Sequence, residues 1–347
     1  MAKLGEVCLL KAGKFVSAND ISPEYNKGLY PCFGGNGIRG YVADYTHDGE
    51  FPLIGRQGAL CGNVNLASGK FHATEHAVVV QPKIEMNVHW LYYALNAMNL
   101  GQYATGAAQP GLAVSKLETL SIEIPNISEQ NKIAQTLCKV EQLVNFRKQQ
   151  LAKLDGLVKA RFVEMFGDPV SNPMGWKRVR FDSISENLDS KRVPVTESDR
   201  KDGVYPYYGA SGIVDWINDY IFDEDILLVS EDGANLLMRS TPIAFSVSGK
   251  SWVNNHAHVV RFHDFATQKF IEVYFSLIDI SEYITGTAQP KLNQAKLNTM
   301  LFCWPPLSLQ KQFAAFVERV DQQKQTVQQS LEKLELMKKA LMQEYFG

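Results

Sequence analysis

The sequence lacks any run of eighteen apolar residues among its 347, so we expect no membrane-spanning segment. It opens without the basic stretch and apolar core of a secretory signal. Its cysteines number five and share no metal-like spacing, which argues against both a zinc site and a disulfide framework. We therefore expect a cytoplasmic protein with reduced thiols, no bound metal and no membrane contact.

The sequence also lacks a strong charge of one sign. Its formal net charge is −2, which does not by itself predict binding to nucleic acid. A DNA-binding surface would therefore have to be a local basic patch, with the acidic residues placed elsewhere. The 45% hydrophobic and 21% charged content is typical of a globular protein, and the length allows two domains plus connecting helices.

What the sequence does contain is an internal repeat. Residues 105–112, Thr-Gly-Ala-Ala-Gln-Pro-Gly-Leu, return as residues 285–292, Thr-Gly-Thr-Ala-Gln-Pro-Lys-Leu, at an offset of 180. Residues 30–38 match residues 205–213 at an offset of 175. Short apolar runs between glycine-rich turns in both copies predict strands. A chain made of two similar mixed α/β halves suggests a target that also comes in two parts.

Each copy ends in a segment of about forty residues with apolar side chains at heptad spacing, a pattern that requires a partner helix. The residues predicted to pack between the helices are Ile133, Leu137, Val140, Val144, Leu151, Leu154 and Val158 in the first, and Phe313, Val317, Val320, Val327, Leu331, Leu334 and Leu341 in the second. Lys324 and Lys338 interrupt the second row. We favour antiparallel pairing within the chain over pairing between chains. Ser128 and Ser308 can cap the helix starts, and Gly167 and Gly347 suit the helix ends.

The predicted class is α+β: two similar mixed α/β domains separated by two long helices that form an antiparallel coiled coil, with a pseudo-two-fold internal repeat. The predicted boundaries are residues 1–125 for the first domain, 126–167 for the first helix, 168–304 for a linker and the second domain, and 305–347 for the second helix.

Two motifs, each present twice, carry a family resemblance. One is the loop at residues 106–112 and 286–292; the other is the helix start at residues 125–130 and 305–310. Together they resemble the specificity subunit of type I restriction-modification systems over essentially the whole chain. Leu309 departs from the family pattern, which usually has Glu there.

The resemblance implies two target-recognition domains, each on one half-site of a bipartite double-stranded DNA sequence, with the helices fixing the half-site spacing. It also implies that two methyltransferase subunits carrying S-adenosylmethionine dock on the helices, and that restriction subunits using ATP and Mg²⁺ join them. This chain itself would hold no cofactor and catalyse nothing. Consistently, it has no methyltransferase, phosphate-loop or nuclease motif.

Side chains that contact bases and phosphates are mostly Arg, Lys, Asn, Gln, Ser and Thr on loops. The predicted DNA-binding residues are Lys14, Asn36, Arg39, Arg56, Gln57 and Gln109 in the first domain, and Lys191, Arg192, Ser211, Lys250, Asn254, Asn255 and Gln289 in the second. The alternative interpretation of each residue is that it is an ordinary solvated surface charge or a turn-forming amide with no role in DNA binding. His76 and His256 are expected to be buried and hydrogen-bonded rather than ligands.

Three alternatives stay open at this point: a specificity protein of another defence or modification system, a coiled-coil scaffold that binds only proteins, and a fused modification enzyme. Absent methyltransferase motifs count against the enzyme, and duplicated loop-rich domains count against the scaffold.

Overall fold

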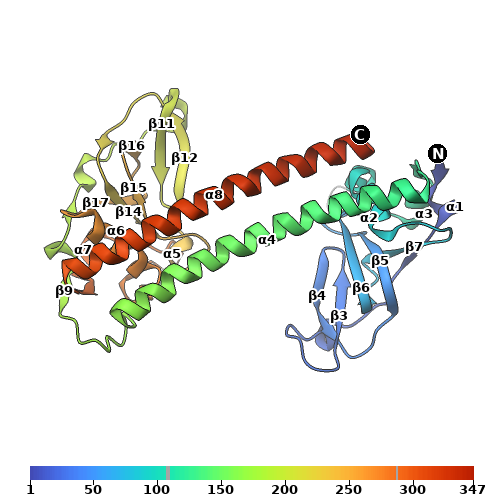
Figure 1. Cartoon of the computed structure of the whole chain (residues 1–347), viewed down its shortest axis with the longest axis horizontal. Helices are drawn as coiled ribbons and strands as arrows, with labels where there is room; N and C mark the ends of the chain where they lie inside the picture. The colour runs from blue at the N-terminus through green and yellow to red at the C-terminus, as the bar shows by residue number, and fades with distance from the viewer. Residues whose placement is uncertain (107–109, 287) are drawn as a thin grey trace. The chain divides into compact units, whose positions relative to one another are not determined.

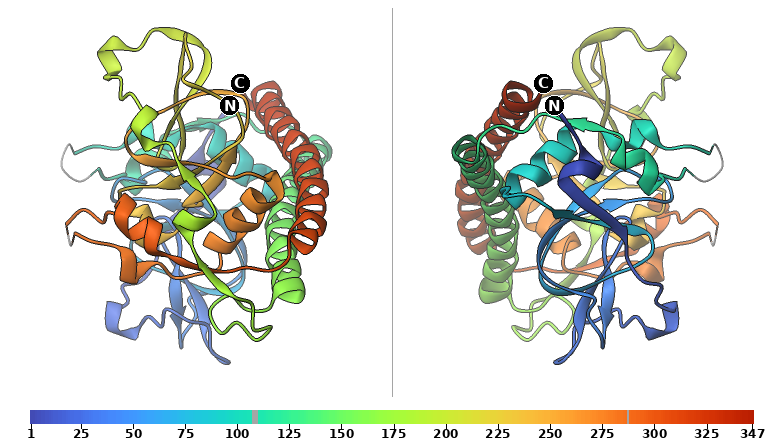
Figure 2. Two further views of the ribbon diagram at one scale, coloured as in Figure 1. Left: turned by 90° about the vertical axis from the view of Figure 1, so that its left-hand side faces the viewer. Right: turned by 90° about the vertical axis from the view of Figure 1, so that its right-hand side faces the viewer.

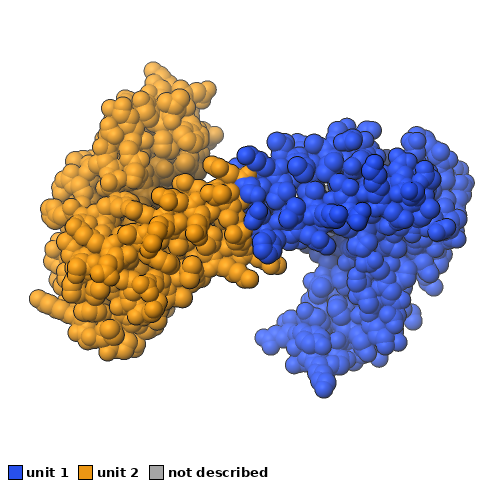
Figure 3. All heavy atoms as spheres, viewed as in Figure 1, with its two compact units in different colours: residues 1–147, 330–347 blue, residues 148–329 orange. Residues whose placement is uncertain are grey.

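The computed structural model describes residues 1–106, 110–286 and 288–347. The chain divides into two compact units (Figure 3). Unit 1 comprises residues 1–147 and 330–347, and unit 2 comprises residues 148–329. The division therefore cuts through both long helices, because each half of each helix packs on its own domain. No helix among the described residues is long and apolar enough to cross a membrane.

Unit 1 is built on a six-stranded sheet (Figure 1) whose order is β2 (Cys8–Ala12), β7 (Ala77–Pro82), β5 (His47–Gly55), β6 (Val64–Ala73), β3 (Tyr30–Gly34) and β4 (Gly37–Val42). A short pair, β1 (Ala2–Lys3) and β8 (Ser121–Ile122), lies beside it. The helices are α1 (Leu4–Val7), α2 (Val88–Ala97) and α3 (Val114–Glu118), with 3-10 turns at Ala18–Asp20 and Leu100–Tyr103. The Asn87 side chain accepts from the Trp90 amide and so caps α2. Trp90 is buried in the core between α2 and the sheet.

Unit 2 repeats this plan with its strands divided between sheets: β10 (Glu186–Asn187), β17 (Ala257–Arg261), β14 (Ile226–Ser230) and β15 (Ala244–Val247); then β12 (Gly212–Ile217), β11 (Asp202–Gly209), β16 (Lys250–Val253) and β13 (Phe222–Asp223). A two-stranded pair joins β18 (Leu301–Cys303) to β9 (Arg178–Arg180). The helices are α5 (Asn235–Met238), α6 (Phe265–Phe275) and α7 (Gln294–Thr299), with 3-10 turns at Phe181–Ser183, Asp189–Lys191, Glu197–Asp199 and Ser281–Tyr283.

The repeat extends to strand register. In unit 1 the parallel pair β3–β6 aligns Phe33 with Ala73, and in unit 2 the parallel pair β11–β16 aligns Tyr208 with Val253. These partners are related by the same offsets of 175 and 180 that the sequence displays. The predicted α+β class with an internal repeat is therefore confirmed.

The long helices are α4 (Ile127–Phe166) and α8 (Leu307–Phe346), each of 40 residues. The first amides of α4 are capped by Asn126, whose side-chain oxygen accepts from the Glu129 amide at 3.0 Å. The predicted cap, Ser128, is instead inside the first turn, because the helix starts earlier than the serine suggested. At the other end Gly167 takes a φ of +77°, as expected for a C-terminal glycine.

Within each unit the two helices run antiparallel, side by side (Figure 2). In unit 1 the Lys338 ammonium lies 2.5 Å from a Glu141 carboxylate oxygen. In unit 2 Lys324 pairs with Asp155. Moving forward along α4 from Glu141 to Asp155 therefore moves backward along α8 from Lys338 to Lys324, which confirms the predicted antiparallel pairing. The two lysines that interrupt the heptad row are the residues that bridge the helices.

Burial along the predicted packing rows is nearly continuous. Ten of the fourteen side chains are buried: Ile133, Leu137, Val140, Val144, Val158, Phe313, Val317, Val320, Val327 and Leu331. The other four, Leu151, Leu154, Leu334 and Leu341, are half-buried. The stripe does more than join two helices, because Leu137 belongs to the core of unit 1 and Phe313 to that of unit 2.

Reversing the charge of Lys338 tests the helix bridge in unit 1. We expect Lys338→Glu to lower the free energy of unfolding by roughly 1 kcal/mol, because the pair is half-exposed and partly screened. Glu141→Gln keeps an acceptor for the Tyr93 hydroxyl and removes only the charge, so in that background Lys338→Glu should cost clearly less, as measured by urea unfolding. An equal cost in both backgrounds would mean that the two charges do not interact.

Candidate nucleic-acid interface

Three loops of unit 1 are tied together by backbone hydrogen bonds into what we term the loop frame. Its members are residues 55–58, 74–76 and 110–112. The Arg56 amide donates to the His76 carbonyl at 3.0 Å, and the Leu112 amide donates to the Arg56 carbonyl at 2.9 Å. The Gly58 amide donates to the Pro110 carbonyl at 3.0 Å. The frame thus fixes the end of β5 against residues 110–112.

Unit 2 carries the same loop frame, made of residues 230–233, 254–256 and 290–292. The Glu231 amide donates to the His256 carbonyl at 2.8 Å, and the Leu292 amide donates to the Glu231 carbonyl at 2.8 Å. The Gly233 amide donates to the Pro290 carbonyl at 3.0 Å. Each bond has its counterpart in unit 1, so the two frames share a backbone and differ in side chains.

The side chains of the unit 2 loop frame belong to a buried charge network. Arg192 donates to Glu231 at 2.7 Å, and Lys291 lies 3.1 Å from the other oxygen of the same carboxylate. His258 is 1% exposed and contacts Asp189 at 2.6 Å through Nδ1 and the Leu292 carbonyl at 2.8 Å through Nε2. With an acceptor at each ring nitrogen, the imidazole donates from both and is therefore cationic.

The acidic residues of this network could in principle be metal ligands. Asp189, Glu231 and His258 each offer a ligand atom within 4.8 Å of one another, close enough to hold a metal ion. However, Arg192 and Lys291 already supply cations to those carboxylates. Two carboxylates therefore already face three cationic side chains, Arg192, Lys291 and His258, and this positive charge disfavours a metal ion at the cluster.

The unit 1 loop frame carries the opposite charge at the matching position. Arg56 occupies the position of Glu231, and Gly111 occupies the position of Lys291, so a cation replaces an anion in the frame. Beside the frame lies an open groove of about 480 Å³, which we term the β3–β4 groove; it is lined by Gly35, Asn36, Gly37, Ile38, Arg39, Gln57, Gly58, Leu60 and His76. A polar groove with exposed Arg, Asn and Gln can bind base edges or phosphates.

Comparison with known families identifies the fold. The family model of the type I restriction modification DNA specificity domain matches residues 1–155 and 173–336. The chain belongs to this family. The two matched specificity domains correspond to the two copies seen in the sequence and in the structure.

Individual relatives agree with this assignment. The specificity subunit of the type I restriction enzyme EcoprrI of Escherichia coli is 53% identical over 143 residues, which is 41% of this chain and 36% of that protein. The MjaIX specificity subunit of Methanocaldococcus jannaschii is 21% identical over 299 residues, covering 75% and 68% of the two chains. The chain thus matches about a third of the length of its E. coli relative. In fold, the chain resembles the S subunit from M. genitalium with a TM-score of 0.69 at 16% identity, over 99% and 95% of the two chains.

In the first specificity domain, the predicted DNA-binding residues gather mostly around the β3–β4 groove. Asn36, Arg39 and Gln57 line it and are exposed. Arg56 is half-buried in the loop frame, and Lys14 is exposed just after β2. Gln109 lies outside the described residues. The contacts of all six with DNA remain predictions.

In the second specificity domain the predicted residues are more scattered. Lys191, Ser211, Lys250, Asn255 and Gln289 are exposed. Arg192 and Asn254 have internal contacts instead: the charge network holds Arg192, and the Asn254 side chain accepts from the His256 amide at 2.8 Å. The exposed surface available to DNA in unit 2 therefore excludes most of these two side chains.

The two repeated histidines are not buried as expected. The side chain of His76 is 38% exposed and that of His256 is 49% exposed. Both stand at the rim of the loop frame, where His256 contacts Asp232 at 2.9 Å and His76 contacts Glu75 at 3.1 Å. Their repetition reflects a shared backbone position at the rim rather than a shared core contact.

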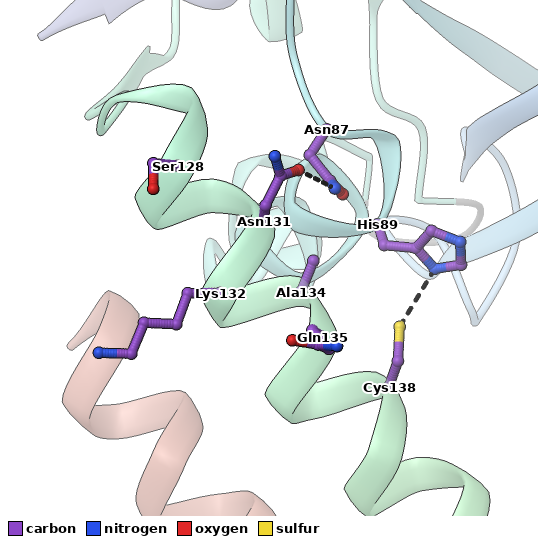
Figure 4. A pocket seen from close by; sticks show the side chains of 8 residues that line it. All are labelled: Asn87, His89, Ser128, Asn131, Lys132, Ala134, Gln135 and Cys138. Carbon is purple, nitrogen blue, oxygen red and sulfur yellow. Dashed lines mark hydrogen bonds between the residues drawn. The ribbon is translucent and has the colours of Figure 1, made fainter.

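A further polar pocket lies in unit 1 between α2 and α4 (Figure 4). The Cys138 sulfur lies 3.3 Å from His89 Nδ1, and His89 Nε2 lies 3.2 Å from a Glu50 oxygen. Asn87 donates to Asn131 at 2.7 Å. These contacts attach the first half of α4 to α2 and to strand β5.

The charge network of unit 2 is the feature that the sequence reading missed. Its carboxylates and cations come from segments 189–192, 231, 258 and 291, which are far apart in the chain. The one available signal was the replacement of Arg56 by Glu231 beside a matched Gly-Ala pair. That exchange marks a position where the two domains differ in charge while keeping the same loop.

Proposed function

We propose that the chain is the DNA specificity subunit of a type I restriction-modification complex and that each unit recognises one half of a bipartite duplex target. The observation that carries this proposal is the loop frame, which occurs twice with one backbone and two different sets of side chains. A repeated scaffold with altered side chains suits two domains that bind related ligands of different sequence. Family membership supports the same conclusion.

We further propose that the subunit is not catalytic and acts through partners. Methyltransferase subunits holding S-adenosylmethionine would dock on the long helices, and restriction subunits would supply ATP- and Mg²⁺-dependent cleavage. Exposed apolar side chains on the helices support a docking role. Phe146 on α4 is 60% exposed and Leu336 on α8 is 69% exposed, both within unit 1.

The test is competition binding by the chain assembled with its methyltransferase subunits. Adenine methylation mapped in the source genome, with and without this chain, gives the target. We expect the complex to bind that duplex at least about a thousandfold more tightly than a scrambled one, with affinity falling steeply as salt rises. Equal affinity for both duplexes would contradict sequence recognition, and no binding to either would favour the protein-only scaffold.

A further inference from the structure

We propose that the β3–β4 groove of unit 1 is where the first specificity domain recognises a G·C pair, with Arg39 donating to the guanine edge, while the equivalent place in unit 2 does not recognise bases. This inference rests on the proposed function and adds a chemical identity to one contact. Three observations support it: the packing of the Arg39 side chain on the Gly34 backbone, the unpaired polar atoms beside the groove, and the contrast with unit 2.

The Arg39 side chain packs against the backbone of Gly34, which has no Cβ atom. A Cβ atom built on Gly34 would lie 2.5 Å from Arg39 Cδ and 2.9 Å from its Cγ. The arginine stem therefore lies directly over the Gly34 backbone, where only glycine leaves room. A stem fixed in this way aims a planar guanidinium from a rigid strand, which suits bidentate donation to guanine O6 and N7.

The polar atoms around the groove favour a base edge over a phosphate. The exposed Gln57 amide both donates and accepts, as base edges in the major groove do, whereas a phosphate group only accepts. The Glu75 carboxylate lies against His76 at the groove rim. A carboxylate at this position opposes the approach of a phosphate group.

Unpaired buried atoms single out the same region. Among the described residues, eight side-chain nitrogen or oxygen atoms are buried without a hydrogen-bond partner. Four of them lie in the unit 1 loop frame: Arg56 Nε, Thr74 Oγ1, Glu75 Oε2 and His76 Nδ1. Buried polar atoms are normally paired, so this concentration marks the loop frame beside the groove as a place where unit 1 keeps unused hydrogen-bonding groups.

The equivalent positions in unit 2 are already satisfied. Glu231 is paired with Arg192 and Lys291, and His256 Nδ1 contacts Asp232. Val214 stands where unit 1 has Arg39, with its methyl group 3.0 Å from a Cβ built on Gly209. The second domain thus keeps the glycine, Gly209, but has an apolar valine in place of the hydrogen-bond donor Arg39. It must therefore recognise its half-site through other residues.

The experiment uses the full chain assembled with its methyltransferase subunits and the target mapped from the genome. Arg39→Ala should relax the requirement for one guanine in one half-site, with a loss of about 5- to 150-fold in affinity for the cognate duplex. Gly34→Ala keeps the charge but displaces the arginine stem, and it should relax the same position. The matched control, Val214→Ala in unit 2, should leave both half-sites unchanged.

A DNA substitution supplies the second arm. Replacing that guanine by 7-deazaguanine removes the N7 acceptor, so the unsubstituted complex should lose affinity while the Arg39→Ala complex should bind both duplexes alike. A uniform loss on every sequence, with a smaller dependence on salt, would identify Arg39 as a phosphate contact and overturn the proposal. No change at all would overturn it too. If the complex has no defined target, the proposed function itself fails, so the two failures are distinguishable.

Discussion

Phe162→Ala is expected to lower the free energy of unfolding of unit 2 by about 3–5 kcal/mol, the usual cost of truncating a buried phenylalanine. Phe162 is 1% exposed and lies at the centre of an aromatic cluster. Its ring centroid is 5.2 Å from that of Phe270 on α6 and 5.5 Å from that of Phe313 on α8. One side chain therefore joins both long helices to the domain, and its removal leaves a cavity shared by all three.

The neighbouring residue provides the control. Val163 lies next in the same helix and is 43% exposed, so Val163→Ala should change stability by no more than about 0.5 kcal/mol. Urea unfolding gives the overall effect, and amide hydrogen exchange assigns it to a unit. Equal losses for the two variants, or loss of protection in unit 1 alone, would contradict the assigned packing.

Asp189→Ala is the second large effect, expected to destabilise unit 2 by about 3–5 kcal/mol. The aspartate is 8% exposed; it accepts from His258 at 2.6 Å and from the Val259 amide at 2.8 Å. Removing it leaves a buried cation and a buried amide without their acceptor. As a control, Asp182→Ala removes an aspartate of unit 2 that pairs with Arg180 at the surface, and it should have little effect.

The same carboxylate predicts a pH dependence. Burial alone would raise the pKa of Asp189, but the hydrogen bond and charge of His258, with the Val259 amide, outweigh it and hold the pKa below 3.8. A carboxyl group whose folded pKa is lowered contributes stability above its unfolded pKa and loses it as the pH falls through the folded value. The unfolding free energy of wild-type unit 2 should therefore fall below about pH 4 more steeply than that of Asp189→Asn. Parallel curves from pH 7 to pH 3 would contradict this role.

The helices and the repeat could be predicted from the sequence because their signals are local or exactly periodic. Heptad spacing requires only that residues such as Val140 and Val144 recur on one face, and burial follows. The cap of α4 was misplaced because Asn126 and Ser128 are equally good capping residues two positions apart. Only the observed hydrogen bond to Glu129 distinguishes them.

The candidate site was harder to predict, since its chemistry depends on which charges meet. Arg56 and Arg192 look alike in the sequence, yet one lies in a frame with an unpaired Nε and the other is held by Glu231. The acidic partner lies 39 residues away along the chain. No local pattern reports such a pairing, so residue type alone overestimated the basic surface of the second domain.

Unit 1 is discontinuous in sequence, since it comprises residues 1–147 and 330–347, and this has a consequence for its biosynthesis. Four partly buried side chains of α8 pack against its core: Leu341, Met342, Tyr345 and Phe346, with the Phe346 ring 6.4 Å from that of Trp90. These side chains leave the ribosome only after all of unit 2 has been made. The domain that is translated first is therefore completed last, and until then its nascent form exposes the apolar patch around Trp90 to chaperones and proteases.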